Sequence, residues 1–191
     1  MASMSDIILA NEEKFNYLHP LVHTDKDTAH SYIDYVYSKV FSQIKDDTKK
    51  LLELGVLAGS SLHLWKDYFS NAHIYGCDIN PQYFSTEKDE RITVYGADAY
   101  QKDFVDTLEN DFDIIIDDGP HTLETMIFFV KNYPYKVKSG GLLIIEDIPD
   151  INWISSIIEN IPDNYKCSAI QLYDLRHIKN RSDDILMIIT I

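Results

Sequence analysis

A short stretch in the second half of the chain, residues 113–121 (Asp-Ile-Ile-Ile-Asp-Asp-Gly-Pro-His), limits the fold more than any other. The three consecutive isoleucines at 114–116 leave no polar face, so they predict a central strand of a parallel sheet that helices cover on both sides. The run ends on Asp117, Asp118 and His121, and open α/β sheets bind their ligands at the carboxyl ends of the strands. This polar cluster is therefore the candidate for the chemistry of the protein.

A second predicted strand, residues 142–145, ends in the same way, on Glu146 and Asp147. If the two strands are neighbours in the sheet, their ends bring four carboxylates and one imidazole together. We expect the rest of the chain to supply a scaffold and a cofactor site for this cluster.

Strand and helix patterns alternate along the chain. The predicted strands cover residues 50–56, 73–79, 92–95, 114–116, 142–145, 166–175 and 185–191, and the predicted helices cover residues 33–44, 62–69, 101–108, 122–133 and 151–160. Asp27 or Thr28 is the expected cap of the first helix. These patterns predict an α/β three-layer sandwich with a Rossmann-like, mostly parallel seven-stranded sheet and a C-terminal antiparallel hairpin. Residues 1–23 are a polar N-terminal segment without a clear period, and residues 24–191 are expected to form a single domain.

Composition excludes several classes of partner. The net charge of −14, without a cluster of lysines or arginines, disfavours nucleic acid as a substrate and favours a neutral small molecule, a sugar or a cation-assisted site. No apolar run approaches the length of about 18 residues that a membrane span needs, so we expect a cytoplasmic protein. Cys77 and Cys167 lie far apart without metal-ligand spacing, which predicts two buried thiols rather than a zinc site or a disulfide.

The first predicted strand leads through a glycine turn into a helix, which is the arrangement of nucleotide-binding sites. Glu53, Gly55, Gly59 and Ser60 are assigned to cofactor binding, because glycines let a ligand approach the backbone and the helix N-terminus favours polar groups. The spacing differs from the Gly-x-Gly-x-x-Gly fingerprint, which argues against a nicotinamide dehydrogenase. An acidic residue two positions before the first glycine suits a ligand with a positive centre, such as a sulfonium.

Acidic residues also end the second and third predicted strands. Asp78 is placed to accept both hydroxyls of a ribose, and Asp98 is placed to accept the exocyclic amine of an adenine. Asp117, at the end of the central strand, is assigned to the same cofactor site. Two structural alternatives stay open, namely that Gly55 serves only a turn and that Asp98 only caps the helix 101–108.

With these residues in place, the chain resembles the class I S-adenosylmethionine-dependent methyltransferases. The Leu-Glu-Leu-Gly-Val-Leu-Ala-Gly-Ser loop at 52–60, Gly-Cys-Asp-Ile at 76–79 and Gly-Ala-Asp at 96–98 stand in that family's order. A narrower similarity joins it to the metal-dependent O-methyltransferases of macrolides and sugars. Its residues are Thr24-Asp25-Lys26 with His30 and Tyr32, the Asp-Asp-Gly-x-His motif at 117–121, and Ile-Glu-Asp at 145–147.

The resemblance implies an S-adenosylmethionine-dependent O-methyltransferase in which Asp118, Glu146 and Asp147 bind one Mg²⁺ or another divalent cation. Hard oxygen ligands of this kind suit Mg²⁺, which keeps positions open for substrate hydroxyls. His121 follows Asp118 by three residues, so the same turn can direct it at the acceptor hydroxyl as general base. The implied acceptor is a sugar or another glycosylated small molecule, with no nucleic acid or membrane partner.

Other interpretations stay open. The acceptor could be a catechol-like diol, or the chain could bind S-adenosylmethionine without catalysis. Glu146 and Asp147 could be a helix cap and a solvated carboxylate, and His121 a surface residue at a helix N-terminus. The sequence assigns no role to Arg176 and His177, and it leaves homo-oligomer formation open.

Overall fold

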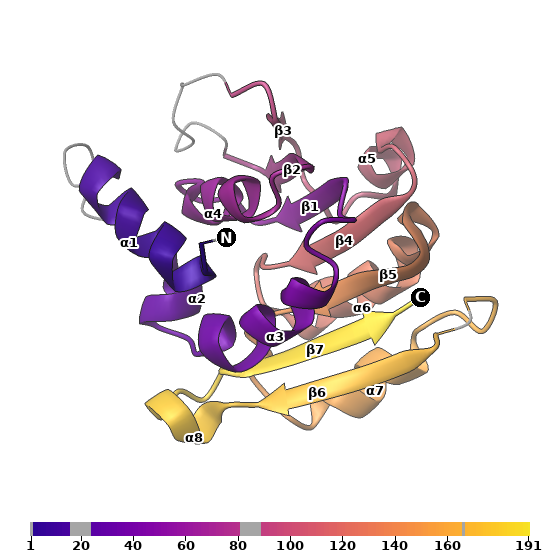
Figure 1. Ribbon diagram of the computed structural model, residues 1–191. Coiled ribbons are helices and arrows are strands. Elements are labelled where there is room, and N and C mark those ends of the chain that lie inside the picture. Colours follow the sequence, from indigo (N-terminus) through magenta and orange to yellow (C-terminus); the bar gives the residue numbers. More distant parts are fainter. Residues whose placement is uncertain (1, 16–23, 81–88, 166) are drawn as a thin grey trace.

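The computed structural model describes residues 2–15, 24–80, 89–165 and 167–191, and its centre is a seven-stranded sheet (Figure 1). The strands are β1 (Lys50–Leu54), β2 (His73–Asp78), β3 (Ile92–Gly96), β4 (Phe112–Asp117), β5 (Val137–Ile145), β6 (Ala169–Asp174) and β7 (Ile185–Thr190). They lie in the order β3-β2-β1-β4-β5-β7-β6. β1 to β5 pair in parallel, whereas β7 pairs antiparallel with both β5 and β6. The predicted fold class, including its C-terminal antiparallel hairpin, is confirmed.

Helices cover both faces of the sheet and make three layers (Figure 1). One face packs against α1 (Met4–Phe15), the π-helical turn η1 (Ile33–Tyr37), α3 (Ser38–Val40), the 3₁₀ turn η2 (Phe41–Gln43) and α4 (Ser60–Tyr68). The other face packs against α5 (Lys102–Thr107), α6 (Leu123–Asn132) and α7 (Trp153–Glu159). The remaining helical segments are α2 (Asp25–Thr28), η4 (Pro134–Lys136) and α8 (Arg176–Lys179).

The isoleucine run lies at the centre of this architecture, in β4. Ile114, Ile115 and Ile116 are all 0% exposed. Ile114 and Ile116 belong to the core under α4, and Ile115 belongs to the core under α6, because successive side chains of a strand point to opposite faces. The prediction of a strand that water reaches on neither face is confirmed.

The register of the parallel strands brings their carboxyl ends to one edge. Leu54 at the end of β1 pairs with Cys77 of β2 and with Asp117 of β4, and Asp117 pairs in turn with Ile145 of β5. The polar residues that follow these strands therefore emerge side by side. The predicted meeting of the two acidic strand ends follows from this register.

The N-terminal part of the chain departs from the sequence prediction. Residues 4–15 form α1, and Met4, Ile7 and Ile8 are buried in the core cluster that also contains residues of α4. Met4, Ile7 and Ile8 have the spacing of one helix face, but sequence analysis missed the helix because this pattern covers little more than one turn. Part of the predicted segment 1–23 lies outside the described residues, so the division at residue 24 stays a prediction.

Other element boundaries also differ. The predicted helix 33–44 is a continuous run of π, α and 3₁₀ turns, and Tyr32 rather than Asp27 or Thr28 stands at its N-cap. β5 begins at Val137 rather than at residue 142, so it is longer than the predicted strand 142–145. Position 141 suits glycine, because a Cβ added there would lie only 2.9 Å from the Asp113 carbonyl oxygen, which is too close.

Within the described residues, none of the helices has both the length and the apolar character needed to cross a bilayer.

Candidate functional site

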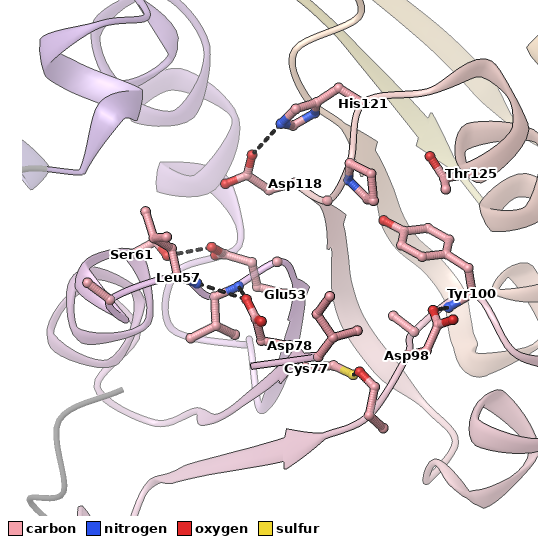
Figure 2. Close-up of a pocket in the computed structure, with 18 of the residues that line it drawn as sticks. Glu53, Leu57, Ser61, Cys77, Asp78, Asp98, Tyr100, Asp118, His121 and Thr125 are labelled. Atoms are coloured by element: carbon pink, nitrogen blue, oxygen red, sulfur yellow. Dashed lines mark hydrogen bonds and ion pairs between the residues drawn. The ribbon is translucent and has the colours of Figure 1, made fainter. Parts of the chain in front are cut away.

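A cavity of about 920 Å³ opens at the carboxyl ends of the parallel strands (Figure 2). The predicted site residues that line it are Glu53, Gly55, Ser60, Asp78, Asp98, Asp118 and His121. Gly59, Asp117, Glu146 and Asp147 are not among the lining residues. The structure therefore brings seven of the predicted site residues to one cavity, whereas four do not line it.

The glycine turn after β1 forms one wall of the cavity. Gly55 has φ +86°, and a Cβ at this position would lie 2.0 Å from the carbonyl oxygen of Asp118. Gly59 has φ +82° and stands at the N-cap of α4, whose first residues Ser60 and Ser61 line the cavity. Gly55 thus serves more than a turn, because its missing side chain lets the ends of β1 and β4 meet backbone to backbone.

Asp78 at the end of β2 fastens this turn. Its Oδ2 accepts the backbone N–H groups of Val56 at 2.9 Å and Leu57 at 3.0 Å, and its Oδ1 accepts the N–H of Asn80 at 2.7 Å. Figure 2 shows the contact between Leu57 and Asp78. A carboxylate has about four acceptor positions, so Asp78 keeps capacity for a ligand hydroxyl while it holds the loop.

Asp98, after β3, makes comparable local contacts. Its Oδ1 accepts the backbone N–H of Tyr100 at 2.9 Å, and its Oδ2 accepts the side-chain amide of Gln101 at 3.0 Å. Gln101 itself stands at the N-cap of α5, without a side-chain cap. Asp98 therefore holds the residues that lead into α5, and it also lines the cavity.

Asp117 and Asp118 have different partners: Asp117, the last residue of β4, contacts Tyr100, whereas Asp118, which follows the strand, contacts Lys26. Asp117 is 3% exposed and accepts a hydrogen bond from the hydroxyl of Tyr100, a cavity-lining residue. Burial raises the pKa of Asp117 to about 7, although the Tyr100 hydroxyl and the Gly119 N–H stabilise its charged form. Tyr100 thus stands between Asp117 and the cavity, and sequence analysis had not singled it out.

Glu53 lines the cavity at its α4 side and is 0% exposed. One of its oxygens accepts the hydroxyl of Ser61, and the other accepts the indole N–H of Trp65 (Figure 2 shows Ser61). Burial raises the pKa of Glu53, against the opposing effect of Lys26 and these two donors. The carboxylate is therefore held rigidly under the glycine turn.

Lys26 of α2 reaches into the carboxylates at the strand ends. Its Nζ lies 2.6 Å from Asp118 Oδ2, contacts Glu146 Oε2 and lies 3.9 Å from Glu53 Oε1. Burial opposes the charge, but the three carboxylates raise the pKa of Lys26 well above its usual range. One ammonium cannot neutralise three carboxylates, and burial keeps the pKa values of Asp118 and Glu146 raised.

Glu146 is more enclosed than the sequence suggested. It is 0% exposed, its Oε2 contacts Lys26, and its Oε1 accepts the hydroxyl of Tyr37. Both oxygens of this predicted metal ligand therefore already have donors from the N-terminal part of the chain.

Asp147 is held by the same part of the chain. The Tyr32 hydroxyl donates to its Oδ1 at 2.7 Å and accepts its backbone N–H at 3.1 Å. His30 Nε2 lies 3.2 Å from Asp147 Oδ2, and His30 Nδ1 lies 3.5 Å from Asp184 Oδ1. Burial opposes protonation of His30, but Asp147 prevails and raises the pKa of the imidazole. Burial raises the pKa of Asp147, but His30, Tyr32 and His121 together lower it below its usual value.

His121 lies beside Asp118 (Figure 2), and its side chain is 33% exposed. Its Nε2 lies 3.9 Å from Asp118 Oδ1 and 3.8 Å from Asp147 Oδ2. Burial lowers the pKa of His121, so the imidazole is neutral at neutral pH. His121 and Asp147 have φ values of +54° and +51°, a conformation that costs non-glycine residues about 1–3 kcal/mol and that is common at functional sites.

Two groups of side chains could hold a metal ion among the described residues. The ligand atoms of Asp118, His121 and Asp147 lie within 4.8 Å of one another, and so do those of Asp25, His30 and Asp147. The first group borders the cavity and offers two carboxylate oxygens, the type of donor that Mg²⁺ prefers. The residues present therefore fit a divalent cation next to His121.

Cys77 also lines the cavity, but not as a reactive thiol. Its S–H donates to the Ala97 carbonyl oxygen at 3.3 Å, and burial raises its pKa to about 12. Cys77 and Cys167 are both free thiols, and Cys77 is buried whereas Cys167 is partly exposed.

Sequence reasoning missed the roles of Lys26, His30, Tyr32, Tyr37 and Tyr100. Lys26, His30 and Tyr32 belong to the motif that carried the family resemblance, but nothing local shows what they contact. Arg176, in α8, pairs with Asp174 at 2.7 Å on the surface, away from the cavity lining.

Comparisons with known proteins identify the family of this chain. A family model described as a methyltransferase domain matches residues 52–148, about half of the chain. Mycinamicin VI 2''-O-methyltransferase of Micromonospora griseorubida is 32% identical over 128 residues, which are 61% of this chain and 31% of that protein. A tetracenomycin-C rhamnosyl 2'-O-methyltransferase of Streptomyces olivaceus is 29% identical over 141 residues, 68% of this chain and 36% of that protein. This chain thus spans about a third of the length of these curated relatives.

Solved structures show the same fold. MycE methyltransferase in complex with Mg, SAH and mycinamycin VI superposes with a TM-score of 0.67 at 21% identity, over 96% of this chain and 54% of that one. Fibrillarin of Aeropyrum pernix, in complex with S-adenosyl-L-methionine, superposes with a TM-score of 0.60 at 17% identity, over 77% and 68% of the two chains.

Proposed function

Since the chain belongs to the methyltransferase-domain family, we propose that it transfers a methyl group from S-adenosylmethionine to a hydroxyl of a sugar or a glycosylated small molecule, with the help of Mg²⁺. The observation that carries the proposal is the content of one cavity. It has a glycine turn with Asp78 and Asp98 on one side, and Asp118 with a neutral imidazole on the other.

The first side suits the cofactor. Asp78 and Asp98 face the cavity with acceptor capacity for a ribose hydroxyl and an adenine amine, and Gly55 leaves the backbone open to a ligand. Asp117 contributes indirectly, through its hydrogen bond with Tyr100. The acidic lining favours a sulfonium over an anionic cofactor.

The second side suits a divalent cation and an acceptor. Asp118 and Asp147 would hold the ion, and Glu146 would join them only if Lys26 or Tyr37 released one of its oxygens. A bound Mg²⁺ would polarise the acceptor hydroxyl as a Lewis acid. His121 supplies the base, because its lowered pKa keeps Nε2 free to accept the hydroxyl proton.

The acceptor class has weaker support. Several relatives are named as sugar or macrolide O-methyltransferases, and the acidic cavity disfavours an anionic acceptor. A catechol-like diol would satisfy the same cation chemistry, so the two classes must be compared by assay.

The test begins with binding rather than turnover. S-adenosylhomocysteine is titrated into the protein by calorimetry, and Mg²⁺ is then titrated into the complex. We expect both to bind, and we expect Asp118→Asn to lose the Mg²⁺ signal while it keeps the cofactor signal. Asp106→Asn is the matched control, since Asp106 is an exposed carboxylate of α5 that pairs with Lys102 away from the cavity.

The acceptor is then identified by methyl transfer to a panel of glycosides and catechols. Transfer to glycosides that His121→Gln abolishes supports the full proposal. Cofactor binding without any Mg²⁺ signal would remove the cation from the mechanism, and the absence of cofactor binding would overturn the proposed activity.

A further inference from the structure

Tyr100 connects two ends of the cavity that lie on different strands. Its backbone N–H donates to Asp98 Oδ1 at 2.9 Å, and its hydroxyl donates to Asp117 Oδ1 at the end of β4. Figure 2 shows the Tyr100 side chain directed from the Asp98 end of the cavity toward the turn that carries Asp118 and His121. One residue therefore joins the end of β3 to the end of β4.

A glycine leaves the space that the Tyr100 hydroxyl occupies. A Cβ added at Gly119 would overlap the Tyr100 Oη and would lie 2.9 Å from Cζ. The ring also contacts Phe128 of α6 edge to face, with 6.1 Å between the ring centroids. The contact of the hydroxyl with Asp117 thus depends on glycine at position 119.

Asp117 connects the Tyr100 hydroxyl to the turn at residues 118–121. The backbone N–H of Gly119 stabilises the charge of the Asp117 carboxylate, whose Oδ1 also accepts the Tyr100 hydroxyl. Hydrogen bonds to a charged carboxylate are among the stronger ones in proteins, so the two donors limit how the carboxylate can turn. The hydroxyl therefore restrains the Gly119 backbone through Asp117.

The turn needs this restraint because its conformation is unfavourable. His121 has φ +54°, a backbone conformation that a non-glycine residue keeps only where its surroundings enforce it. The turn begins at Asp118, whose N–H donates to the Leu54 carbonyl oxygen at 2.9 Å, and it is followed by Thr122, the N-cap of α6. A support at Gly119, between these two anchors, fixes the direction of the His121 side chain.

We propose that Tyr100 is a positioning residue, whose hydroxyl fixes the turn 118–121 through Asp117 and so directs the His121 imidazole at the acceptor hydroxyl. The proposal rests on the role of His121 in the proposed function. Asp117, which the sequence assigned to cofactor binding, acts here through the turn that carries the base. A base displaced by about 1 Å loses much of its effect, so the Tyr100 hydroxyl contributes to the rate without touching a reacting atom.

The test compares Tyr100→Phe, which removes only the hydroxyl, with Tyr75→Phe. Tyr75 is a buried tyrosine of β2 whose hydroxyl also donates to a carboxylate, Glu109 Oε1 at 3.1 Å, away from the cavity lining. Hydrogen exchange of the Gly119 and His121 amides is measured by NMR in the protein without ligands. We expect these amides to exchange at least about tenfold faster in Tyr100→Phe than in the parent protein, and at the parent rate in Tyr75→Phe.

Methyl transfer then shows whether the turn matters for the reaction. With cofactor and acceptor saturating, we expect kcat of Tyr100→Phe to fall at least about tenfold, because general-base catalysis is lost as the imidazole moves. The affinity for S-adenosylhomocysteine and the KM for the acceptor stay within about twofold of the parent values, since the ring still lines the cavity. Tyr75→Phe keeps the parent kcat.

A second variant tests the same contact from the side of the turn. Gly119→Ala displaces the Tyr100 hydroxyl and should therefore lower kcat as well. In the Tyr100→Phe background no hydroxyl is left to displace, so the two changes together should lower kcat by much less than the product of their separate effects. Effects that simply multiply would overturn the proposal.

Other outcomes separate this proposal from the function on which it rests. An active parent protein with an unchanged kcat or unchanged amide exchange in Tyr100→Phe removes the role of Tyr100 and leaves the methyltransferase proposal intact. Weaker binding of S-adenosylhomocysteine with an unchanged saturating kcat would make Tyr100 a cofactor contact and would also overturn its positioning role. A parent protein that transfers no methyl group removes the proposed function and the base role of His121 with it, whereas faster exchange in Tyr100→Phe would still show that the hydroxyl holds the turn.

Discussion

The close approach of Gly55 to Asp118 makes a quantitative prediction for Gly55→Ala. The new methyl group would begin 2.0 Å from the Asp118 carbonyl oxygen and 2.7 Å from its carbon. Both are backbone atoms, and the Asp118 N–H is bound to the Leu54 carbonyl oxygen at 2.9 Å, so the contact cannot be relieved by a side-chain rotation. The ends of β1 and β4 must move apart, by roughly 1 Å or more, before the contact becomes ordinary.

The expected cost has two parts. The left-handed backbone at φ +86° costs alanine about 1–2 kcal/mol, and overpacking between two strand ends costs about 1–3 kcal/mol more. The free energy of unfolding therefore falls by about 2–5 kcal/mol. Affinity for S-adenosylhomocysteine also falls, because the turn that faces the cavity is displaced.

Gly140→Ala is a matched control within the same sheet. Gly140 has φ +79°, but no atom lies within 4 Å of an added Cβ. It therefore carries the backbone cost of about 1–2 kcal/mol without the contact. Urea unfolding gives both free energies, and calorimetry gives both affinities. If Gly55→Ala is no less stable than Gly140→Ala and keeps its affinity, the close approach is not what requires glycine after β1.

Three further predictions concern protons. The value of kcat/KM should decrease on the acid side only at a pH below the usual histidine pKa of about 6.5, because burial lowers the pKa of His121. A pH profile of methyl transfer that already loses activity well above this pH would exclude His121 as the base. Tyr100→Phe removes a donor to buried Asp117, so its loss of stability should be larger at pH 8, where the carboxylate is charged, than at pH 5; equal losses in urea unfolding at the two pH values would contradict this. The pKa of His30 is raised by Asp147, so its stabilising charge is fully present below about pH 6.5 and is lost as pH rises through the folded-state pKa; His30→Gln should therefore destabilise the protein more at pH 5.5 than at pH 9.

The strands could be predicted because their signal is local. A run such as residues 114–116 is apolar on both faces, and only the middle of a covered sheet hides both faces. The positions of the acidic strand ends follow from the register of parallel strands, so the gathering of the candidate site residues was also accessible from the sequence. Helix α1 was not predicted, because the role of Met4, Ile7 and Ile8 becomes visible only in their packing in the core that also contains α4.

The contacts that hold the site could not be predicted because their partners lie far apart in the sequence. Lys26 and Asp118 are 92 residues apart, and Tyr32 and Asp147 are 115 apart. No periodicity or spacing links such positions. A lone lysine or tyrosine near the N-terminus has no local sign that it will be buried against a carboxylate.

The contacts of Lys26, Tyr32 and Tyr37 explain why this sheet needs the segment before β1. A parallel sheet that ends in Asp118, Glu146 and Asp147 concentrates negative charge in a region that water scarcely reaches. The sheet itself offers no cation there, because the strand ends carry only acidic and apolar side chains at these positions. Donors must therefore come from another element, and the segment of α2 and η1 supplies an ammonium and two hydroxyls to these carboxylates. It follows that the segment belongs to the site as much as the strands do, since without it the carboxylates would repel one another or take up protons.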